Sequence, residues 1–302
     1  MKRTCLLLLT AVQLFGLESL SQRLAHTDPS KFKVAKAVHG GAGTLNYTAL
    51  LSEHSLETNL NFFHRGILNP HSGAGNHLHY FDDEMYFILD GEAQFTVDGR
   101  TSTLKGPAGA LCPLGHSHAL YNATDKPIEW MNISVSSIRG KNSSYNMNDT
   151  MEKVAVIDPI PYFVTMTLNH SLLRPVQAMN GGTGTVQYRR ALQPQNFSSP
   201  WAYVDDLVLP PGSSVGKHMH REVAEVFYVV SGQGSFSVPT EGGADETVSI
   251  HSGDAIPLRL NEVHSFKNTG SEPLEFMVIG VSRDPARTVD SVDVTANGSS
   301  SQ

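Results

Sequence analysis

The sequence predicts an all-β protein built from two tandem barrels or sandwiches. Two observations carry this prediction: the chain matches itself at an offset of 141 residues, and each copy consists of short alternating strands broken by glycine and proline. No amphipathic pattern is long enough to indicate a helix of several turns. With 302 residues, 40% of them hydrophobic and 17% charged, the composition is globular and excludes a disordered chain.

The first residues have the pattern of a secretory leader. Met1-Lys2-Arg3 precedes an apolar run at 5–17, and Ser19-Leu20-Ser21 offers small residues at the positions that a signal peptidase reads. An apolar run of about 13 residues is shorter than the roughly 20 that span a bilayer. We therefore predict a signal peptide at 1–21, a secreted or lumenal mature protein, and no membrane partner.

Glycosylation sequons support export. Chance predicts about three Asn-x-Ser/Thr sequons in a chain of this composition, and an excess favours a glycoprotein of a eukaryotic secretory route. The sequons begin at Asn46, Asn122, Asn132, Asn142, Asn148, Asn169, Asn196 and Asn297.

Charge and cysteine content exclude other classes. The net charge is −7, and no stretch combines basic residues with aromatic ones, so we expect no nucleic-acid partner. Of the two cysteines, Cys5 lies in the predicted leader and only Cys112 remains, so the mature chain is expected to have no internal disulfide.

The repeat sets the predicted domain boundaries. HGGAGT at 39–44 aligns with NGGTGT at 180–185, and the match continues through both copies with one short insertion. A polar stretch at 141–153 separates the copies and predicts an exposed linker. We therefore predict a first domain at 32–140, the linker, a second domain at 154–285 and a disordered tail at 288–302.

Strand patterns within the copies suggest what faces the interior. The segment 85–99 predicts a strand, a turn and a strand, 226–238 repeats it, and 202–212 and 275–281 predict further strands. Since side chains alternate along a strand, the residues in phase with a glutamate at 84 or 225 should share its pocket. Those residues are Tyr86, Ile88, Phe227 and Val229.

Each copy also carries a constellation of metal-ligand type. A His-x-His pair is followed by four residues and a glutamate, and another histidine comes 39 or 44 positions after the pair. On a strand, residues i and i+2 share a face, so His77 and His79 project together, as do His218 and His220. Three imidazoles and one carboxylate suit a divalent first-row metal, and four protein ligands leave positions open for a substrate.

These patterns resemble the two motifs of the cupin superfamily. The second copy contains the first motif complete: Gly212, five residues, His218-x-His220, four residues, Glu225, six residues and Gly232. The first copy has it from His77 to Gly91, with His71 in place of the leading glycine. The second motif is Pro113-x-Gly115, His118 and Asn122 in copy one, and Arg259, Asn261, His264 and Asn268 in copy two, where Arg259 and Asn261 replace its proline and glycine.

The resemblance covers nearly the whole mature chain and implies a bicupin, with two tandem jelly-roll β-barrels. It also implies one divalent transition metal per barrel, with manganese or iron favoured and copper, nickel, cobalt or zinc as alternatives. By this resemblance the ligands are His77, His79, Glu84 and His118 in the first barrel and His218, His220, Glu225 and His264 in the second.

Fold and ligands leave the reaction open, since cupins with this ligand set include oxalate decarboxylases and oxidases, dioxygenases, isomerases and lyases. The superfamily's oxalate enzymes carry an arginine three residues before the first motif histidine, where this chain has Ala74 and Val215. Arg65, Arg189 and Arg190 are nearby in sequence, with nothing to show that they enter a barrel.

We therefore expect a metal-dependent oxidoreductase of dioxygenase type acting on a small oxygenated organic substrate, with Glu84 or Glu225 accepting a proton. One alternative is an oxalate decarboxylase or oxidase that uses manganese. The other is a metal-holding ligand-binding or storage-like extracellular glycoprotein. The fold leaves a homo-oligomer open.

Overall fold

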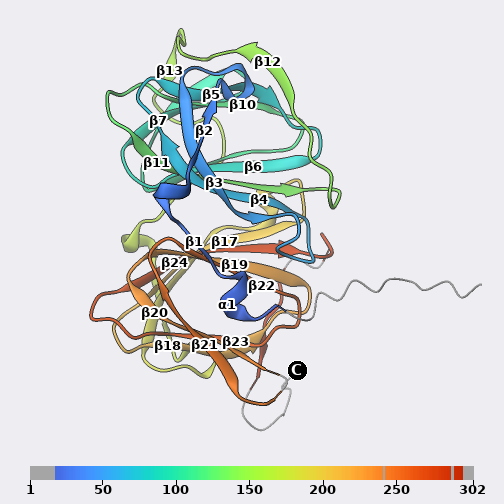
Figure 1. Ribbon diagram of the computed structural model, residues 1–302, viewed down its shortest axis with the longest axis vertical. Helices are drawn as coiled ribbons and strands as arrows, with labels where there is room; N and C mark the ends of the chain where they lie inside the picture. The colour runs from blue at the N-terminus through green and yellow to red at the C-terminus, as the bar shows by residue number, and fades with distance from the viewer. Residues whose placement is uncertain (1–17, 241, 287–288, 295–302) are drawn as a thin grey trace, which may run out of the picture.

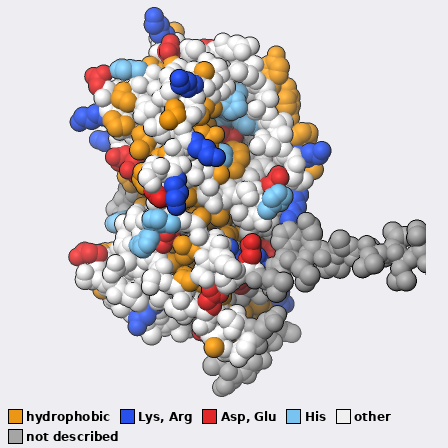
Figure 2. Space-filling view, in the orientation of Figure 1, with side chains coloured by type: hydrophobic (Ala, Val, Ile, Leu, Met, Phe, Trp, Pro, Cys, Tyr) orange, Lys and Arg blue, Asp and Glu red, His pale blue; other side chains and the backbone are white. Residues whose placement is uncertain are grey.

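The computed structural model describes residues 18–240, 242–286 and 289–294. It confirms the all-β fold class, with two barrels stacked along the long axis of the molecule (Figure 1). Most of the predicted leader, and the tail beyond 294, lie outside the described residues. None of the helices in the described ranges is long and apolar enough to span a bilayer. On the face drawn in Figure 2, acidic and basic side chains are interspersed over both barrels.

The first barrel is formed by two sheets. The seven-stranded sheet contains, in spatial order, β14 (Thr165–Thr167), β9 (Ala108–Cys112), β6 (Asp82–Ile88), β11 (Ile128–Ser136), β4 (Leu60–Leu68), β3 (Thr44–Ser52) and β2 (Lys33–Lys36). The six-stranded sheet contains β12 (Tyr145–Asp149), β5 (Ser72–Leu78), β10 (Ser117–Asn122), β7 (Glu92–Val97), β8 (Arg100–Lys105) and β13 (Ile157–Asp158).

The second barrel repeats this arrangement. Its seven-stranded sheet contains β1 (Ala25–His26), β22 (Asp254–Leu258), β19 (Val223–Ser231), β24 (Leu274–Ser282), β17 (Trp201–Leu209), β16 (Thr185–Leu192) and β15 (Arg174–Gln177). Its five-stranded sheet contains β21 (Asp245–His251), β20 (Gln233–Pro239), β23 (His264–Asn268), β18 (Ser214–Met219) and β25 (Val292–Asp293). The helical elements are α1 (Leu20–Arg23) and the 3-10 turns η1 (Pro29–Lys31), η2 (Val38–Gly40), η3 (His170–Leu172), η4 (Met179–Gly181) and η5 (Pro194–Asn196).

Hydrophobic cores fill each barrel and the interface between them. Strand β6 is buried along its whole length, because Met85 and Phe87 face the inter-barrel core while Tyr86 faces the barrel interior. A strand covered on both faces needs no polar alternation, which explains the apolar run Met85–Ile88 in its second half. Glu84 is in phase with Tyr86 and therefore points into the barrel, as the alternation predicted.

The lead-in of each copy adds a strand to the other barrel. Strand β1 pairs with β22 of the second barrel, and β14, its counterpart at the repeat offset, pairs with β9 of the first. Strand β13 also joins the first barrel, through β8. The boundary predicted at residue 154 therefore differs from the structure, in which the chain leaves the first barrel only after β14.

An N-terminal arm, defined here as residues 18–27, lies against the second barrel. Leu20 is 1% exposed and belongs to the core of that barrel. The carboxylate of Glu246 accepts hydrogen bonds from the backbone N–H groups of Leu20 and Ser21, at 2.8 and 2.9 Å, and Arg23 forms an ion pair with Glu262. The predicted leader ended at Ser21, whereas the structure makes Leu20 and Ser21 part of the packing of this barrel.

Two segments predicted to lack structure contain strands. Strand β12 lies in the predicted linker 141–153 and pairs with β5, and β25 lies in the predicted tail and pairs with β18. The side chains of β12 are exposed, as their polarity indicates, but the backbone closes the edge of the sheet.

Two of the predicted sequons are buried. The side-chain amide of Asn122, at 0% exposure, donates hydrogen bonds to the carbonyl oxygens of Leu68, Asn69 and Lys126. Asn132 is 6% exposed and faces the first barrel's interior. Neither amide is accessible to a glycan in the folded chain, so the prediction of glycosylation now rests on the other sequons.

Candidate metal centres

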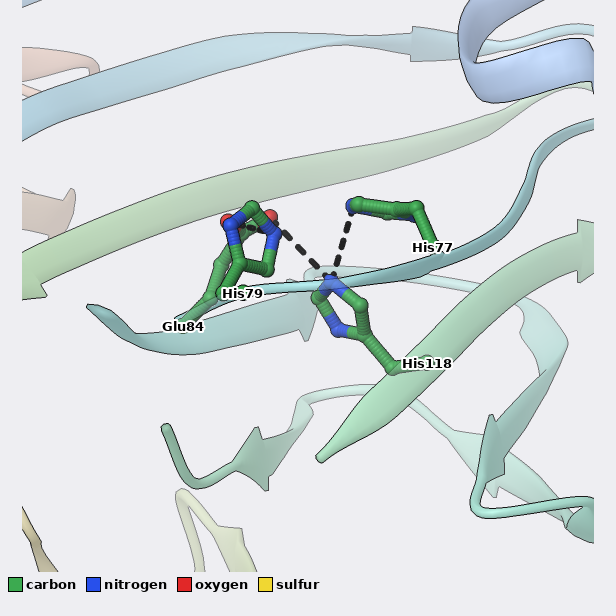
Figure 3. Close-up of side chains that lie close together, drawn as sticks. All are labelled: His77, His79, Glu84 and His118. Carbon is green, nitrogen blue, oxygen red and sulfur yellow. Dashed lines mark hydrogen bonds and ion pairs between the residues drawn. The ribbon is translucent and has the colours of Figure 1, made fainter. Parts of the chain in front are cut away.

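The structure brings the four predicted ligands of the first barrel together (Figure 3). His77 lies on β5, His79 directly after it, Glu84 on β6 and His118 on β10. The Nε2 atoms of His77 and His118 are 2.9 Å apart, and Nε2 of His79 is 2.9 Å from Glu84 Oε2. All four side chains are buried.

Backbone carbonyls orient two of the three histidines, whereas Nδ1 of His118 has no hydrogen-bond partner among the described residues. Nδ1 of His77 donates to the carbonyl of Gly75 at 2.8 Å, and Nδ1 of His79 donates to that of Ser143 at 2.6 Å. Each bond fixes the tautomer whose Nε2 lone pair points inward, which is the usual outer-shell arrangement for a histidine ligand. Ser143 belongs to the segment predicted as a linker, which therefore helps to build the site.

The second barrel gathers its four ligands in the same way. Nε2 of His220 and Nε2 of His264 lie 3.3 and 3.4 Å from Glu225 Oε2. His218 completes the set from β18, where its Nδ1 donates to the carbonyl of Gly216 at 2.9 Å.

Here too the other Nδ1 atoms are held by backbone carbonyls. Nδ1 of His264 donates to Glu262 at 3.0 Å, and Nδ1 of His220 donates to Asp290, next to β25. The segment before β25 thus orients a ligand histidine of the second barrel, as Ser143 does in the first barrel.

The inward atoms have the properties expected around a cation. Within each set, one potential ligand atom per residue lies within 4.8 Å of the others. In the second barrel, Nε2 of His220, Nε2 of His264 and Glu225 Oε2 are buried without a hydrogen-bond partner among the described residues. Leaving such atoms unsatisfied costs about 1–3 kcal/mol each, and a metal ion would satisfy all of them at once. Each barrel therefore carries a complete ligand set for one divalent transition metal.

The pKa values agree with ligand roles. Burial lowers the pKa of His77 to about 4 and that of His218 to about 3, so both offer a lone pair at neutral pH. Burial alone would raise the pKa of Glu84, but neighbouring His79 and His118 hold it well below the usual range. For His79, burial is outweighed by Glu84 and the Asp82 hydrogen bond, which raise its pKa to about 10. The proton that Glu84 favours on His79 occupies the position that a metal cation would take between the two side chains.

The other carboxylate oxygen, Oε1, of each ligand glutamate also accepts a hydrogen bond, but the donors lie on non-equivalent strands of the two barrels. Asn132 Nδ2 donates to Glu84 Oε1 at 2.8 Å from β11, and the Tyr203 hydroxyl donates to Glu225 Oε1 at 2.7 Å from β17. Both carboxylates are therefore oriented before any ligand arrives.

The pocket above the first set is lined mainly by aromatic and imidazole side chains and lacks a permanent cation. It is a cavity of about 150 Å³ that reaches His79 and Glu84. Its other lining residues include His39, Tyr47, Phe62, His64, Tyr86, Trp130 and Asn132, and no lysine or arginine.

The pocket above the second set contains an ion pair. This cavity of about 220 Å³ reaches His218, His220 and Glu225, and Arg190 and Asp205 line it. Nε and Nη2 of Arg190 donate to the two oxygens of Asp205, at 2.9 and 3.1 Å. The guanidinium also lies 4.1 Å from the ring centroid of Tyr203. A small anion beside the second metal set would meet this guanidinium.

The other two arginines near the motifs do not enter a barrel. Arg65 is buried in the inter-barrel interface, where it bonds to Tyr228 and to Glu129. Arg189 donates to the carbonyl of Thr167 at 3.1 Å. Strand parity puts Arg190 on the same face as Tyr188, which lines the same pocket, but parity does not tell which face of the strand is turned inward.

Sequence reasoning also missed His39. Its ring stacks on that of His77, with centroids 3.6 Å apart. His39 has φ of 49° in η2, a left-handed conformation that no strand or helix pattern reveals. The only available signal was the neighbouring Gly-Gly pair, where Gly41 lies so close to β5 that a Cβ would meet the carbonyl oxygen of Gly73 at 2.3 Å.

Known proteins resemble this chain in sequence and in fold. A family profile described as a cupin domain matches residues 64–134 and 206–280. An oxalate-binding protein of Thermotoga maritima is 34% identical over 116 residues, which cover 38% of this chain and 92% of that protein.

Solved structures share the fold over most of the chain. Oxalate decarboxylase from Bacillus subtilis at pH 4.6 is 17% identical with a TM-score of 0.62, covering 89% of this chain and 78% of that one. A formate complex of the oxalate decarboxylase from Lactobacillus farciminis is 15% identical with a TM-score of 0.63, covering 89% and 88%. Another structure of the Bacillus enzyme concerns its Mn(II) centres and has a TM-score of 0.61, with 17% identity and coverage of 89% and 79%.

Proposed function

Because the chain belongs to the cupin superfamily and carries a complete ligand set in each barrel, we propose that it is a secreted, manganese-dependent bicupin that cleaves oxalate. The observation that carries the proposal is the Arg190 guanidinium in the same small pocket as the second ligand set. Relatedness to an oxalate-binding protein, and the likeness in fold to oxalate decarboxylases with Mn(II) centres, support the choice of substrate and metal. The leader pattern and the excess of sequons support secretion.

A dianion requires two positive groups at opposite ends. In the second barrel the metal, held by His218, His220, Glu225 and His264, would bind and polarise one carboxylate. Arg190 would hold the other carboxylate through two parallel hydrogen bonds, for which guanidinium is the best-matched side chain. To do so it must release or share Asp205.

The proposed reaction is a decarboxylation without net oxidation. The carbon–carbon bond of oxalate breaks, one carboxyl group leaves as carbon dioxide, and the electron pair stays on the other carbon. That carbon takes up one proton and becomes formate. A hydrogen oxalate ion supplies this proton, and the Glu225 carboxylate, which lines the same pocket, would relay it to the carbon.

The predicted catalytic role of Glu84 and Glu225 thus stays a proposal, with Glu225 assigned to oxalate. An oxidase reaction would instead consume one dioxygen and two protons per oxalate and release two carbon dioxide and one hydrogen peroxide. The products distinguish the two reactions.

The test uses the full chain loaded with Mn(II) and ¹³C-labelled oxalate. We expect stoichiometric formate and carbon dioxide by NMR and no peroxide in a coupled assay. Arg190→Ala should lower kcat/KM at least about 100-fold, the cost of about 3 kcal/mol for losing a bidentate charged contact. Arg189→Ala is the matched control, since its side chain does not line the pocket, and should stay within about twofold.

Two results would overturn the oxalate proposal: no product from protein that retains two equivalents of manganese, or equal activity in the Arg190 and Arg189 variants. Tight oxalate binding without turnover would favour the ligand-binding alternative.

The first barrel favours a second candidate function. Its pocket combines the ligand set with Tyr47, Phe62, Tyr86 and Trp130 and has no arginine, which suits a neutral aromatic substrate that binds the metal through oxygen. This is where the dioxygenase prediction applies. Oxygen consumption on flavonols, catechols and diketones, lost in His77→Ala but kept in His218→Ala, would support it.

A further inference from the structure

A third group of metal-ligating side chains lies outside both barrels. His26 on β1, His251 at the end of β21 and Asp254 at the start of β22 have potential ligand atoms within 4.8 Å of one another. Asp254 is 0% exposed, whereas the two imidazoles have side-chain exposures of 48% and 57%. The site is thus open to solvent on its histidine side and anchored on its carboxylate side.

Both imidazoles turn the same nitrogen toward that carboxylate. Nδ1 of His26 is 2.6 Å from Asp254 Oδ1, and Nδ1 of His251 is 3.3 Å from Oδ2. Ligand atoms around a single zinc ion, with bonds of about 2.0–2.1 Å, are themselves about 3.3 Å apart. The His251 separation equals that value and the His26 separation is 0.7 Å shorter, so the half-exposed His26 ring must move outward to admit an ion.

The surrounding backbone holds the three residues in place. His26 and Asp254 are directly opposite each other in the β1–β22 ladder. The turn between His251 and Asp254 is closed by the backbone N–H of His251, which donates to Asp254 Oδ2 at 2.8 Å. Thr27 N–H donates to the Gly253 carbonyl at 2.9 Å, just beyond the ladder.

The repeat shows that the fold does not require these residues. The equivalent strand pair in the first barrel, β14 with β9, has the same register and the same flanking backbone hydrogen bond, from Leu168 to Pro107. The positions equivalent to His26, His251 and Asp254 are Thr167, Lys105 and Ala108. Strand pairing is therefore achieved there with no ligating group, and the cluster on the second barrel needs another explanation.

We propose that His26, His251 and Asp254 form a third metal site, which binds a divalent cation of the zinc class and fastens the N-terminal arm to the second barrel. Two imidazoles and one carboxylate are ligands that zinc, nickel and copper prefer, and they leave a fourth position for water. One ligand comes from the arm and two from the barrel, so the bound ion cross-links segments more than 220 residues apart, as Asp254 is 228 positions from His26.

The test counts zinc in the full chain after equilibrium dialysis at micromolar free Zn²⁺, by elemental mass spectrometry. Wild type should hold one equivalent more than His26→Ala and one more than His251→Ala, whatever the occupancy of the barrels. His116→Ala is the matched control: its side chain is 49% exposed and its Nδ1 is 2.6 Å from Asp98, but it has no second histidine. This control should bind as much zinc as wild type.

A second readout separates binding from misfolding. Zinc should raise the melting temperature of wild type and of the His116 variant by a few degrees more than that of either cluster variant, because a ligand bound only to the folded state stabilises it. Equal zinc counts in wild type and His251→Ala, or equal zinc-dependent shifts, would overturn the proposal. Oxalate turnover plays no part in either measurement, so the outcome is independent of the proposed function.

Discussion

The two barrels hold the same ligands but surround them with different walls. At positions 141 residues apart, Ala49 corresponds to Arg190, Phe62 to Tyr203 and His64 to Asp205. These three exchanges give the second pocket an ion pair and a hydroxyl, while the first keeps aromatic and imidazole groups. The comparison teaches that the repeat preserves what binds the metal, and that the pocket residues that differ lie on β3, β4, β16 and β17, where under the proposed function the substrate would be selected.

The largest expected difference is in metal content and turnover. His218→Ala should lose the second metal and lower oxalate turnover at least about 1000-fold, because several kcal/mol of transition-state stabilisation go with the ion. His77→Ala should lose the first metal and keep turnover within about threefold. Elemental analysis and formate release on the same samples measure both. Equal loss of turnover in the two variants would contradict a division of roles between the barrels.

The next effect concerns stability, since the arm places Leu20 in the core of the second barrel. In a chain that retains residues 18–27, Leu20→Ala removes a fully buried side chain from the core of this barrel and should lower the free energy of unfolding by about 3 kcal/mol. Val34→Ala, on a lead-in strand but 63% exposed, should change it by less than about 0.5 kcal/mol. Urea unfolding followed by fluorescence gives both values, and an unaffected Leu20 variant would show that the arm is not part of this core.

A smaller effect on metal affinity is expected from the side chains that donate hydrogen bonds to Glu84 and Glu225. Tyr203→Phe removes the donor to Glu225 and should weaken metal binding in the second barrel about 10-fold, the usual cost of losing an outer-shell partner. Asn132→Val, which copies the equivalent Val278, should do the same in the first barrel alone. Titration of free Mn(II) by EPR would resolve the two sites, and a variant that altered the opposite barrel would argue against this assignment.

The smallest expected effect is at His39. His39→Asn copies Asn180, the equivalent residue, which adopts the same left-handed conformation with φ of 50°. It removes the ring stacked on His77, worth about 1 kcal/mol, and should weaken the first metal site less than 10-fold. The same Mn(II) titration applies, with no change expected in the second barrel.

The sequence was sufficient for the strands of the barrels because they depend on local periodicity, and for the ligand sets because the two copies resemble the motifs of the cupin superfamily. The spacing of His77 and His79, and the phase of Tyr86 with Glu84, follow from alternation along one strand. Arg190 was not predicted because a local pattern cannot tell which face of β16 is turned inward. The arm, β12 and β25 were missed for a related reason: they are short, and they pair with strands that are distant in sequence.

The exchange of lead-in strands makes the halves of this chain inseparable in a particular sense. Each half contributes an edge strand to its neighbour, as two subunits do in a swapped dimer, but here a single polypeptide joins them. A protease that cut one bond in the exposed stretch between Gly140 and Tyr145 would leave two fragments still clasped at both ends. Strand exchange and the core between the barrels would thus hold the two fragments together without the peptide bond between them, at a stoichiometry of one to one.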